Sequence, residues 1–288
     1  MTARSFLQLL RPHHWTKNGF VLAGLLFGHA WSDATLVSAL FATLAFCLAS
    51  SAVYAFNDAL DAPRDREHPE KNGRPVARGA IAPAAAHAIA AALAVLALGL
   101  AAWTAPAVAA LIGAYLAVNA AYSLGLKHVP VLDVFIIAAG FMLRLLAGTW
   151  GVGIEPSRWL LACGFLLTLF LGFAKRRAEL DRLAGDAGQH REVLESYSLA
   201  FLDRAVLACA IGMVITYALY TVADTTVALH GTEHLIWSLP WVLLGTFRYL
   251  FRLHYRSGGG DPAQELLRDP MLAAAALGWV ATVAWLIR

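Results

Sequence analysis

The chain has 288 residues, of which 59% are hydrophobic and 14% are charged, with a mean hydropathy of +0.62. A soluble domain of this length needs more charge to cover its surface, so the composition excludes that class and predicts a polytopic membrane protein. The net charge of +3 is small and gives no indication of a nucleic-acid partner.

Nine apolar runs have about the length that a membrane-spanning helix needs, roughly 20 residues. The first and several others are short, so one of them has the length of a re-entrant or interfacial helix. We therefore expect an all-α protein with about nine transmembrane helices in a single domain over residues 1–288. The runs are residues 17–32, 34–56, 82–103, 106–124, 130–150, 157–175, 200–223, 234–254 and 269–287.

Basic residues are confined almost entirely to alternate connecting segments. They lie in the N-terminal stretch and in several later segments, whereas the connectors between these hold only Arg158. Basic segments of membrane proteins face the cytoplasm. We therefore predict a cytoplasmic-membrane protein with a cytoplasmic N-terminus and with catalytic loops at 57–81, 125–129 and 175–199 on the same side.

The stretch before the first run, residues 11–18, mixes basic and aromatic residues in the order RPHHWTKN. Trp15 is typical of an anchor at the membrane–water interface. Lys17 stands where its ammonium group would reach the phosphate of a lipid, so we count it as a candidate substrate-binding residue.

The clearest chemical motif follows the second run and contains Asn57, Asp58, Asp61 and Asp65. The three acids are spaced i, i+3 and i+7, which places them on one face of a helix. Carboxylates this close repel one another unless a cation lies between them, and their oxygen atoms suit Mg²⁺ bridged to substrate phosphates. We predict a Mg²⁺ site, with a solvated, charged helix end as the alternative. Pro63 interrupts the face and is expected to place Asp65 beyond a kink.

Basic residues follow the acids at once, and Arg66, Lys71 and Arg74 are candidates for substrate binding. A polyanionic substrate explains them, because a metal would hold a diphosphate on one side and these cations would hold it on the other. The alternative explanation is membrane topology alone, which is strongest for Arg78.

A second polar cluster lies between the fourth and fifth runs and continues into the fifth. Tyr122, Lys127 and His128 precede the run, and Asp133 and Arg144 lie within it, about three helical turns apart on one face. An arginine inside a span costs about 2.5–3.5 kcal/mol, so it needs a partner or a role. Either Arg144 and Lys127 hold phosphate, or Arg144 forms a salt bridge to an acid on another helix.

A third cluster, Lys175, Arg176 and Glu179, ends the sixth run. Lys175 and Glu179 are spaced i, i+4 and share a helix face, so the cluster has the spacing to form the opposite wall of a phosphate cavity. Basic residues at the C-terminus of a helix also interact favourably with its dipole, and this second explanation stays open.

These motifs resemble the UbiA superfamily of intramembrane prenyltransferases, whose first motif is Asn-Asp-x-x-Asp-x-x-x-Asp. The resemblance implies nine helices around a central cavity open to the membrane, with Mg²⁺ held by the motif at residues 57–65. Within the superfamily, the chain is most similar to the decaprenyl-phosphate phosphoribosyltransferases. The pieces that carry this similarity are residues 11–18, 57–75, 125–148, 175–180 and 265–269.

General members of the superfamily carry a second Asp-x-x-x-Asp motif where this chain has Lys175 and Glu179. A cation in place of an acid suits a donor with an additional phosphate, such as phosphoribosyl pyrophosphate. The resemblance therefore implies Mg²⁺-dependent transfer of 5-phosphoribose to a polyprenyl phosphate, for arabinan synthesis in the cell envelope, by an enzyme whose relatives assemble as trimers. The implied catalytic residues are Asp58, Asp61, Lys127 and Lys175.

Two other functions fit part of the pattern. An aromatic prenyltransferase of the 4-hydroxybenzoate type would transfer a prenyl group from a prenyl diphosphate, and a transporter or flippase would bind phosphorylated lipids without chemistry. Transfer of label from phosphoribosyl pyrophosphate to a lipid would separate the first from the main prediction. Mg²⁺-dependent release of pyrophosphate would exclude the second.

Overall fold

The computed structural model describes residues 2–28, 30, 32–68, 71–183, 192–255, 260 and 262–287, and all regular secondary structure in these ranges is helical. The expected all-α fold class is confirmed. Parts of two expected catalytic loops, residues 69–70 and 184–191, lie outside the described residues. The chain forms two compact units: unit 1 is residues 1–127 with 140–156, and unit 2 is residues 128–139 with 157–288.

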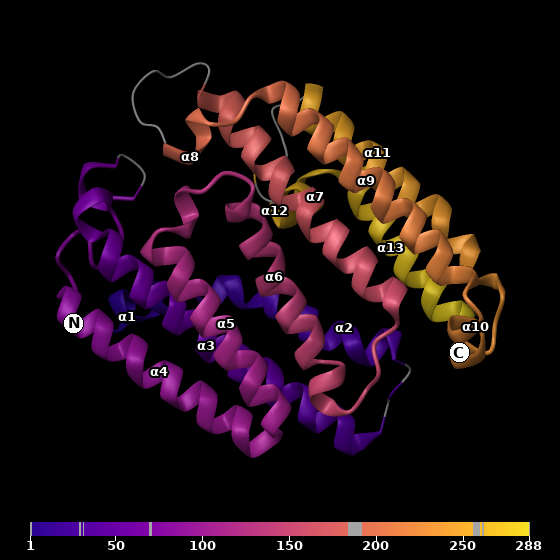
Figure 1. Cartoon of the computed structure of the whole chain (residues 1–288), viewed down its shortest axis with the longest axis horizontal. Coiled ribbons are helices and arrows are strands. Elements are labelled where there is room, and N and C mark those ends of the chain that lie inside the picture. Colours follow the sequence, from indigo (N-terminus) through magenta and orange to yellow (C-terminus); the bar gives the residue numbers. More distant parts are fainter. Residues whose placement is uncertain are drawn as a thin grey trace. The chain divides into compact units, whose positions relative to one another are not determined.

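Unit 1 holds the N-terminal helices. They are α1 (Ala3–Leu10), η1 (Pro12–Asn18), α2 (Gly19–Phe27), α3 (Asp33–Glu67), α4 (Pro83–Thr104), α5 (Pro106–Leu124) and η3 (Trp150–Val152), while η2 (Leu126–His128) and α6 (Leu132–Ala147) are each divided between the two units. Pro83 and Pro106 begin α4 and α5, at a position where a missing backbone N–H costs nothing. Ser32 caps α3 by accepting from the backbone N–H of Thr35. Helix α3 packs against both α4 and α5 (Figure 1).

Small residues allow the helices of unit 1 to approach closely. Ala45 on α3 and Ala101 on α4 are fully buried in the same cluster. A Cβ atom on Gly148 would overlap the backbone carbonyl of Val21, so only glycine fits where the chain passes α2 after α6. Such small-residue contacts are the usual packing mode of helices in membranes.

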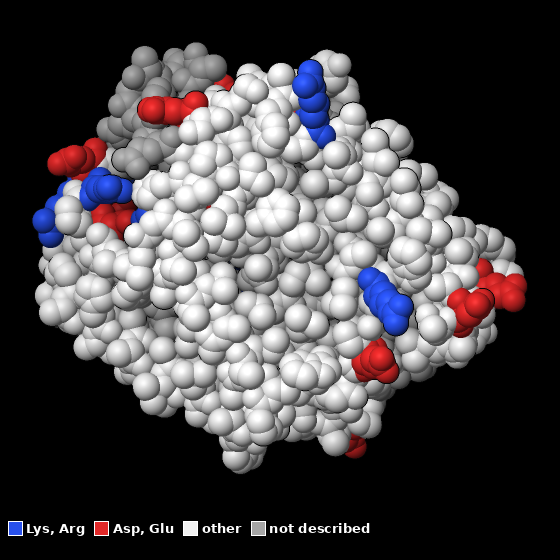
Figure 2. All heavy atoms as spheres, in the orientation of Figure 1, with Lys and Arg blue, Asp and Glu red and all other residues white. Residues whose placement is uncertain are grey.

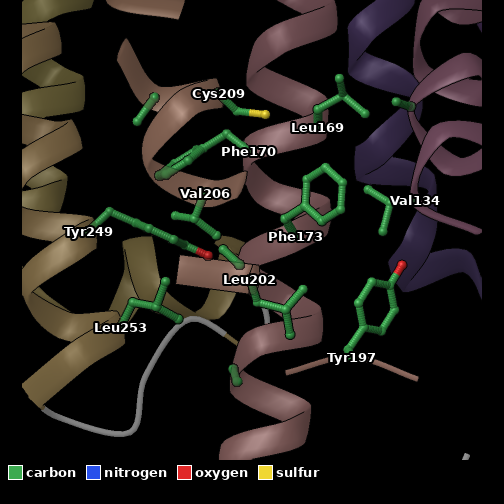
Figure 3. Packing of buried hydrophobic residues seen from close by; sticks show 14 of the residues in the cluster. Val134, Leu169, Phe170, Phe173, Tyr197, Leu202, Val206, Cys209, Tyr249 and Leu253 are labelled. Carbon is green, nitrogen blue, oxygen red and sulfur yellow. The ribbon is translucent and has the colours of Figure 1, made fainter. Parts of the chain in front are cut away.

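Unit 2 holds the C-terminal helices. They are α7 (Arg158–Leu183), α8 (Glu192–Glu195), α9 (Leu199–Val222), α10 (Asp224–His230), η4 (His234–Ser238), α11 (Leu239–Tyr255), α12 (Pro262–Arg268) and α13 (Pro270–Leu286). Ser198 caps α9 by accepting from the backbone N–H of Phe201. Helix α7 packs against α9, and α11 packs against α13 (Figure 1). The core between these helices contains Phe170, Phe173 and Leu202 (Figure 3).

Six helical segments are long and apolar enough to cross a membrane: Asp33–Glu67, Pro83–Thr104, Pro106–Leu124, Leu132–Val152, Arg158–Arg182 and Leu199–Val222. The other three expected runs contain shorter helices, namely α2, α11 and α13. The expected count of nine spans is therefore not confirmed. Six of the nine expected spans do contain a helix of sufficient length and hydrophobicity. Helix α2, with 9 residues, is too short to cross a bilayer alone.

The outer surface of the helices is apolar. Helix α4, for example, exposes Val95, Leu96 and Trp103. The face in Figure 2 carries few charged side chains over most of its area. In water such a surface would promote aggregation, whereas against lipid it costs nothing. The chain is therefore an integral membrane protein.

Candidate active site

The acid motif lies on the end of a helix and not in a loop. Helix α3 continues past the second apolar run, through Pro63, to Glu67. Pro63 costs only one hydrogen bond, to the carbonyl of Ala59, because it stands in the last turns of the helix. We expected a kink at this proline, and the helix continues through it without a break. Arg74 Nη1 lies 3.3 Å from Asp58 Oδ1 and 2.7 Å from Asp65 Oδ2, so these two acids share a face, as predicted.

Each acid of the motif is paired with a cation. Besides Arg74, Arg11 Nη2 donates to Asp58 Oδ1 at 2.5 Å. Lys127 Nζ donates to Asp61 Oδ1 at 2.6 Å. Acidic and basic side chains also lie next to each other at the left edge of Figure 2, over the purple segment that follows α3 in Figure 1. These pairs offset the repulsion between carboxylates that the spacing creates.

A cavity of about 400 Å³ opens beside Asp58 within unit 1. Asp58 is 1% exposed, and its Oδ2 atom has no hydrogen-bond partner among the described residues. A buried carboxylate oxygen left in this way is unusual and indicates that a further group binds there. The lining residues are Gln8, Arg11, His13, His14, Asp58, Gly73, Arg74 and Pro75.

Of the acids in the motif, Asp58 lines the cavity, whereas Asp61 and Asp65 are not among its lining residues. In the described part of the chain, no three His, Cys, Asp or Glu side chains converge closely enough to enclose a metal ion. Mg²⁺ does not need such a cage, since it commonly uses one or two carboxylates together with substrate phosphates and water. The buried Oδ2 atom of Asp58, which has no partner among the described residues, is a hard oxygen of the kind that such a site uses.

The other candidates in unit 1 differ in their exposure and contacts. Arg66 is exposed, and its Nε donates to the carbonyl of Ala77 at 3.1 Å, which ties the end of α3 to the following segment. Lys17 is exposed on η1. Asn57, Lys71 and Tyr122 are partly buried.

Arg144 is buried among neutral groups. Its guanidinium donates to Asn18 Oδ1 at 2.8 Å, to the Gly140 carbonyl at 2.7 Å and to the Tyr115 hydroxyl at 3.0 Å. It also lies 4.7 Å from the Tyr115 ring centroid and 5.3 Å from that of Phe141. Among the described residues no carboxylate pairs with it, so the salt-bridge alternative is not found. Neutral acceptors and cation–π contacts stabilise the charge instead.

In unit 2, Asp133 is the centre of a buried network. Arg176 Nε donates to Asp133 Oδ2 at 2.7 Å, and Arg176 Nη1 donates to Glu179 Oε2 at 2.6 Å. The Tyr197 hydroxyl donates to Asp133 Oδ1 at 2.7 Å and accepts from the backbone N–H of Val131 at 2.5 Å. Figure 3 shows Tyr197 at the edge of the core with its hydroxyl directed toward Val134.

The hydroxyl of Tyr197 supports a strained backbone. Val131 has a φ of 69°, which is a rare conformation for a β-branched residue. Burial, together with the hydrogen bond to Asp133, raises the pKa of Tyr197, so the phenol remains a neutral donor. The remaining candidates of this unit are more accessible: His128 is partly buried, and Lys175 is exposed beside the buried Arg176.

Comparison with known proteins identifies the family. Residues 19–274 match the UbiA prenyltransferase family. The chain belongs to this family. Similar curated proteins are the decaprenyl-phosphate phosphoribosyltransferases of Corynebacterium glutamicum, 35% identical over 96% of this chain and 85% of the relative, and of Mycolicibacterium smegmatis, 33% identical over 96% and 90%. A solved UbiA homolog from Archaeoglobus fulgidus, bound to DMAPP and Mg²⁺, has a TM-score of 0.74 at 20% identity, covering 98% of this chain and 99% of that one.

The family resemblance predicted from the motifs is confirmed, and the chain is a membrane-bound transferase of the UbiA family. Two residues of the site were missed in the sequence analysis. Arg11 begins the stretch at residues 11–18 that carries part of the family resemblance, and this position is the sequence feature that points to it. Tyr197 stands in no periodic pattern and carried no signal of its own.

Proposed function

We propose that this UbiA-family enzyme transfers 5-phosphoribose from phosphoribosyl pyrophosphate to a polyprenyl phosphate, releasing pyrophosphate, with Mg²⁺ bound by the acid motif of α3. The named activity of relatives that are 33–35% identical over 96% of the chain supports this reaction. The Mg²⁺ bound in solved structures of the Archaeoglobus fulgidus homolog supports the metal. Decaprenyl phosphate is the acceptor that the relatives' names suggest.

The composition of the cavity beside Asp58 is the observation on which this proposed function mainly rests. Asp58, which has one buried oxygen without a hydrogen-bond partner in the described ranges, lines this space together with two arginines, Arg11 and Arg74. A diphosphate with its metal needs this combination, an oxygen ligand for the metal and donors for the phosphate oxygens. Bound by Asp58 and Asp61, with Asn57 and Asp65 beside them, Mg²⁺ would neutralise charge on the leaving pyrophosphate.

The chain's own residues then hold two anions close together. The acceptor phosphate is already an oxyanion, so it attacks C1 of the ribose without a general base. The new O–C1 bond forms as the bond from C1 to the pyrophosphate oxygen breaks, and the electron pair leaves with pyrophosphate. Arg74, Lys71 and Lys127 would hold the leaving diphosphate, because fixed cations offset the repulsion between the substrates.

A second group of cations suits the 5-phosphate of this donor. Lys175 is exposed and pairs with no acid in the described ranges, so its ammonium group is available to an anion. A prenyl diphosphate offers no such additional phosphate. We therefore assign Lys175 to the 5-phosphate, with Arg144, Tyr122, His128 and Lys17 as further candidates for substrate contact. In unit 2, Asp133, Arg176 and Glu179 are further candidates for substrate contact.

The proposal places the enzyme in the cytoplasmic membrane with the N-terminus and the ends of α3 and α7 on the cytoplasmic side, where the donor would be dissolved. The distribution of basic residues supports this orientation. The product would supply arabinan synthesis for the cell envelope. A trimeric assembly stays a prediction from the resemblance.

A labelled-donor assay tests the function. Purified enzyme receives Mg²⁺, phosphoribosyl pyrophosphate labelled in the ribose, and decaprenyl phosphate. We expect label to move into the organic phase, with one pyrophosphate released for each labelled lipid and no transfer after chelation of the metal. If label stays in the aqueous phase while a prenyl diphosphate and 4-hydroxybenzoate are joined, the aromatic prenyltransferase is the correct function.

A further inference from the structure

The pairing of Arg11 with Asp58 places a phosphate-binding group and a metal-binding group in direct contact. Arg11 Nη2 lies 2.5 Å from Asp58 Oδ1, and both residues line the cavity beside the acid motif. In this arrangement Asp58 Oδ1 accepts from Arg11 and also from Arg74, at 3.3 Å, while Oδ2 is buried and has no partner among the described residues. A metal at the unpartnered oxygen would therefore stand close to the guanidinium of Arg11, and the two positive charges would repel each other.

We infer that Arg11 restrains Asp58 until the diphosphate donor arrives, and that Arg11 then becomes a ligand of the donor's phosphate. This inference rests on the proposed function. In the exchange, the carboxylate–guanidinium pair is replaced by a carboxylate–metal contact and a guanidinium–phosphate contact. Every charge keeps a partner, so no buried ion is left uncompensated. The metal alone offers Arg11 no new partner, and binding of metal alone is therefore weak.

The guanidinium of Arg11 is held at the cavity independently of Asp58. It lies 5.0 Å from the ring centroid of Tyr54, which precedes Asp58 by one turn of α3. A cation–π contact of this kind holds a cation without neutralising it. Arg11 needs only a side-chain rotation over Tyr54 to pass from the carboxylate to an incoming phosphate oxygen.

The backbone around Arg11 is fixed by other residues. The Ser51 hydroxyl donates to the carbonyl of Leu10 at 2.8 Å, and the indole N–H of Trp15 donates to Ser51 Oγ at 3.0 Å. Arg11 itself has a φ of 51°, in the left-handed region that non-glycine residues seldom adopt. Strained residues of this kind persist where the surroundings determine them, often at functional sites. Because these hydrogen bonds do not involve the side chain of Arg11, removal of that side chain leaves them intact.

Arg78 offers a matched control. It docks α1 through hydrogen bonds from its Nη2 to Ser5 Oγ at 3.0 Å and to Gln8 Oε1 at 2.8 Å. It is exposed and has no acidic partner in the described ranges. Arg78→Ala therefore removes one positive charge and loosens α1, while the pair of Arg11 and Asp58 remains.

The test measures metal binding without turnover. Wild type, Arg11→Ala and Arg78→Ala are compared in equilibrium dialysis with Mn²⁺, which replaces Mg²⁺ as the measurable ion, first alone and then with labelled inorganic pyrophosphate. We expect Arg11→Ala to bind Mn²⁺ alone at least about tenfold more tightly than wild type, because a charge-assisted hydrogen bond no longer competes. We expect the same variant to bind pyrophosphate with Mn²⁺ about tenfold more weakly. Arg78→Ala should match wild type in both.

Three results would overturn the inference. They are an unchanged or weakened Mn²⁺ affinity in Arg11→Ala, an equal gain in Arg78→Ala, and a gain that survives when Asp58→Asn is added to Arg11→Ala. The assay contains neither ribose donor nor lipid. Failure of labelled transfer would therefore overturn the proposed reaction while leaving this measurement interpretable.

Discussion

Two buried aspartates, one in each unit, differ in how much of their hydrogen-bonding capacity is used. Asp58 and Asp269 are 1% and 2% exposed, and each contacts two arginines. Asp269 accepts from Arg248 at 2.7 Å and from Arg252 at 3.0 Å, and its Oδ1 atom also caps α13 by accepting from two backbone N–H groups at 3.0 Å. Asp58 lines a cavity and accepts through one oxygen, while its other oxygen is buried without a partner in the described ranges.

The difference separates a structural acid from one that is available for binding. The Arg248 hydrogen bond, with further help from the cap and Arg252, lowers the pKa of Asp269, so this carboxylate stays charged and joined to its partners. Its contacts link α11, α12 and α13, since Arg252 also donates to Glu265 at 2.5 Å. Within the described residues, no such set of hydrogen bonds involves both oxygens of Asp58.

The largest effect is expected for Asp58→Asn. The amide keeps the shape but loses the charge that a metal ligand needs, so transfer should fall by about 10³-fold or more. The apparent Tm should fall by less than in the corresponding variant of Asp269, because Asp58 has hydrogen-bond partners on one oxygen and Asp269 has them on both. Label transfer to lipid and thermal melting in detergent micelles measure the two quantities. Asp61→Asn should behave in the same way, and full activity in either variant would contradict the metal assignment.

Asp269→Asn should show the opposite pattern. An amide N–H₂ would face two guanidinium groups, and the loss of charge-assisted hydrogen bonds should destabilise unit 2 by about 2–3 kcal/mol. The apparent Tm should fall by roughly 5–10 °C, while activity per folded molecule remains near wild type. If Asp269→Asn melts normally but loses transfer, Asp269 is needed for the reaction and its role is not structural.

Much of the architecture could be predicted from hydrophobicity. The ends of some helices could not, and this failure has a physical cause. The second apolar run ends at Phe56, but α3 continues to Glu67 because a helix does not need apolar residues once it has left the membrane. Conversely, α2 ends at Phe27 inside an apolar run, since hydrophobicity alone does not require a helix to continue.

The site was predictable where its residues are periodic. The shared face of Asp58 and Asp65 follows from helical spacing, and Arg74 confirms it. Arg11 and Tyr197 contact their acids from distant parts of the chain, 47 and 64 residues away in sequence. Such long-range contacts depend on tertiary packing and leave no pattern in a single sequence.

Tyr197→Phe extends the comparison to a third acid with a smaller expected effect. The change removes one donor to Asp133 and one acceptor of the Val131 N–H, both in unit 2. Since Arg176 still neutralises Asp133, the loss should be limited to about 1–2 kcal/mol. Thermal melting measures it, and hydrogen exchange at Val131 should rise. Unchanged exchange there would mean that the hydroxyl does not hold the strained backbone.

The smallest effect is expected for Arg64→Ala, on the same helix turn as the acid motif. Arg64 is exposed and pairs with no acid in the described part of the chain, whereas Arg74 contacts two. Exposed charges contribute little to stability, so the apparent free energy of unfolding should change by less than about 0.5 kcal/mol, and transfer should stay within about twofold of wild type. If transfer falls well beyond twofold, total positive charge at the end of α3 controls donor binding. The contacts that distinguish Asp58 from Asp269 would then be no reason to assign only Asp58 to the reaction.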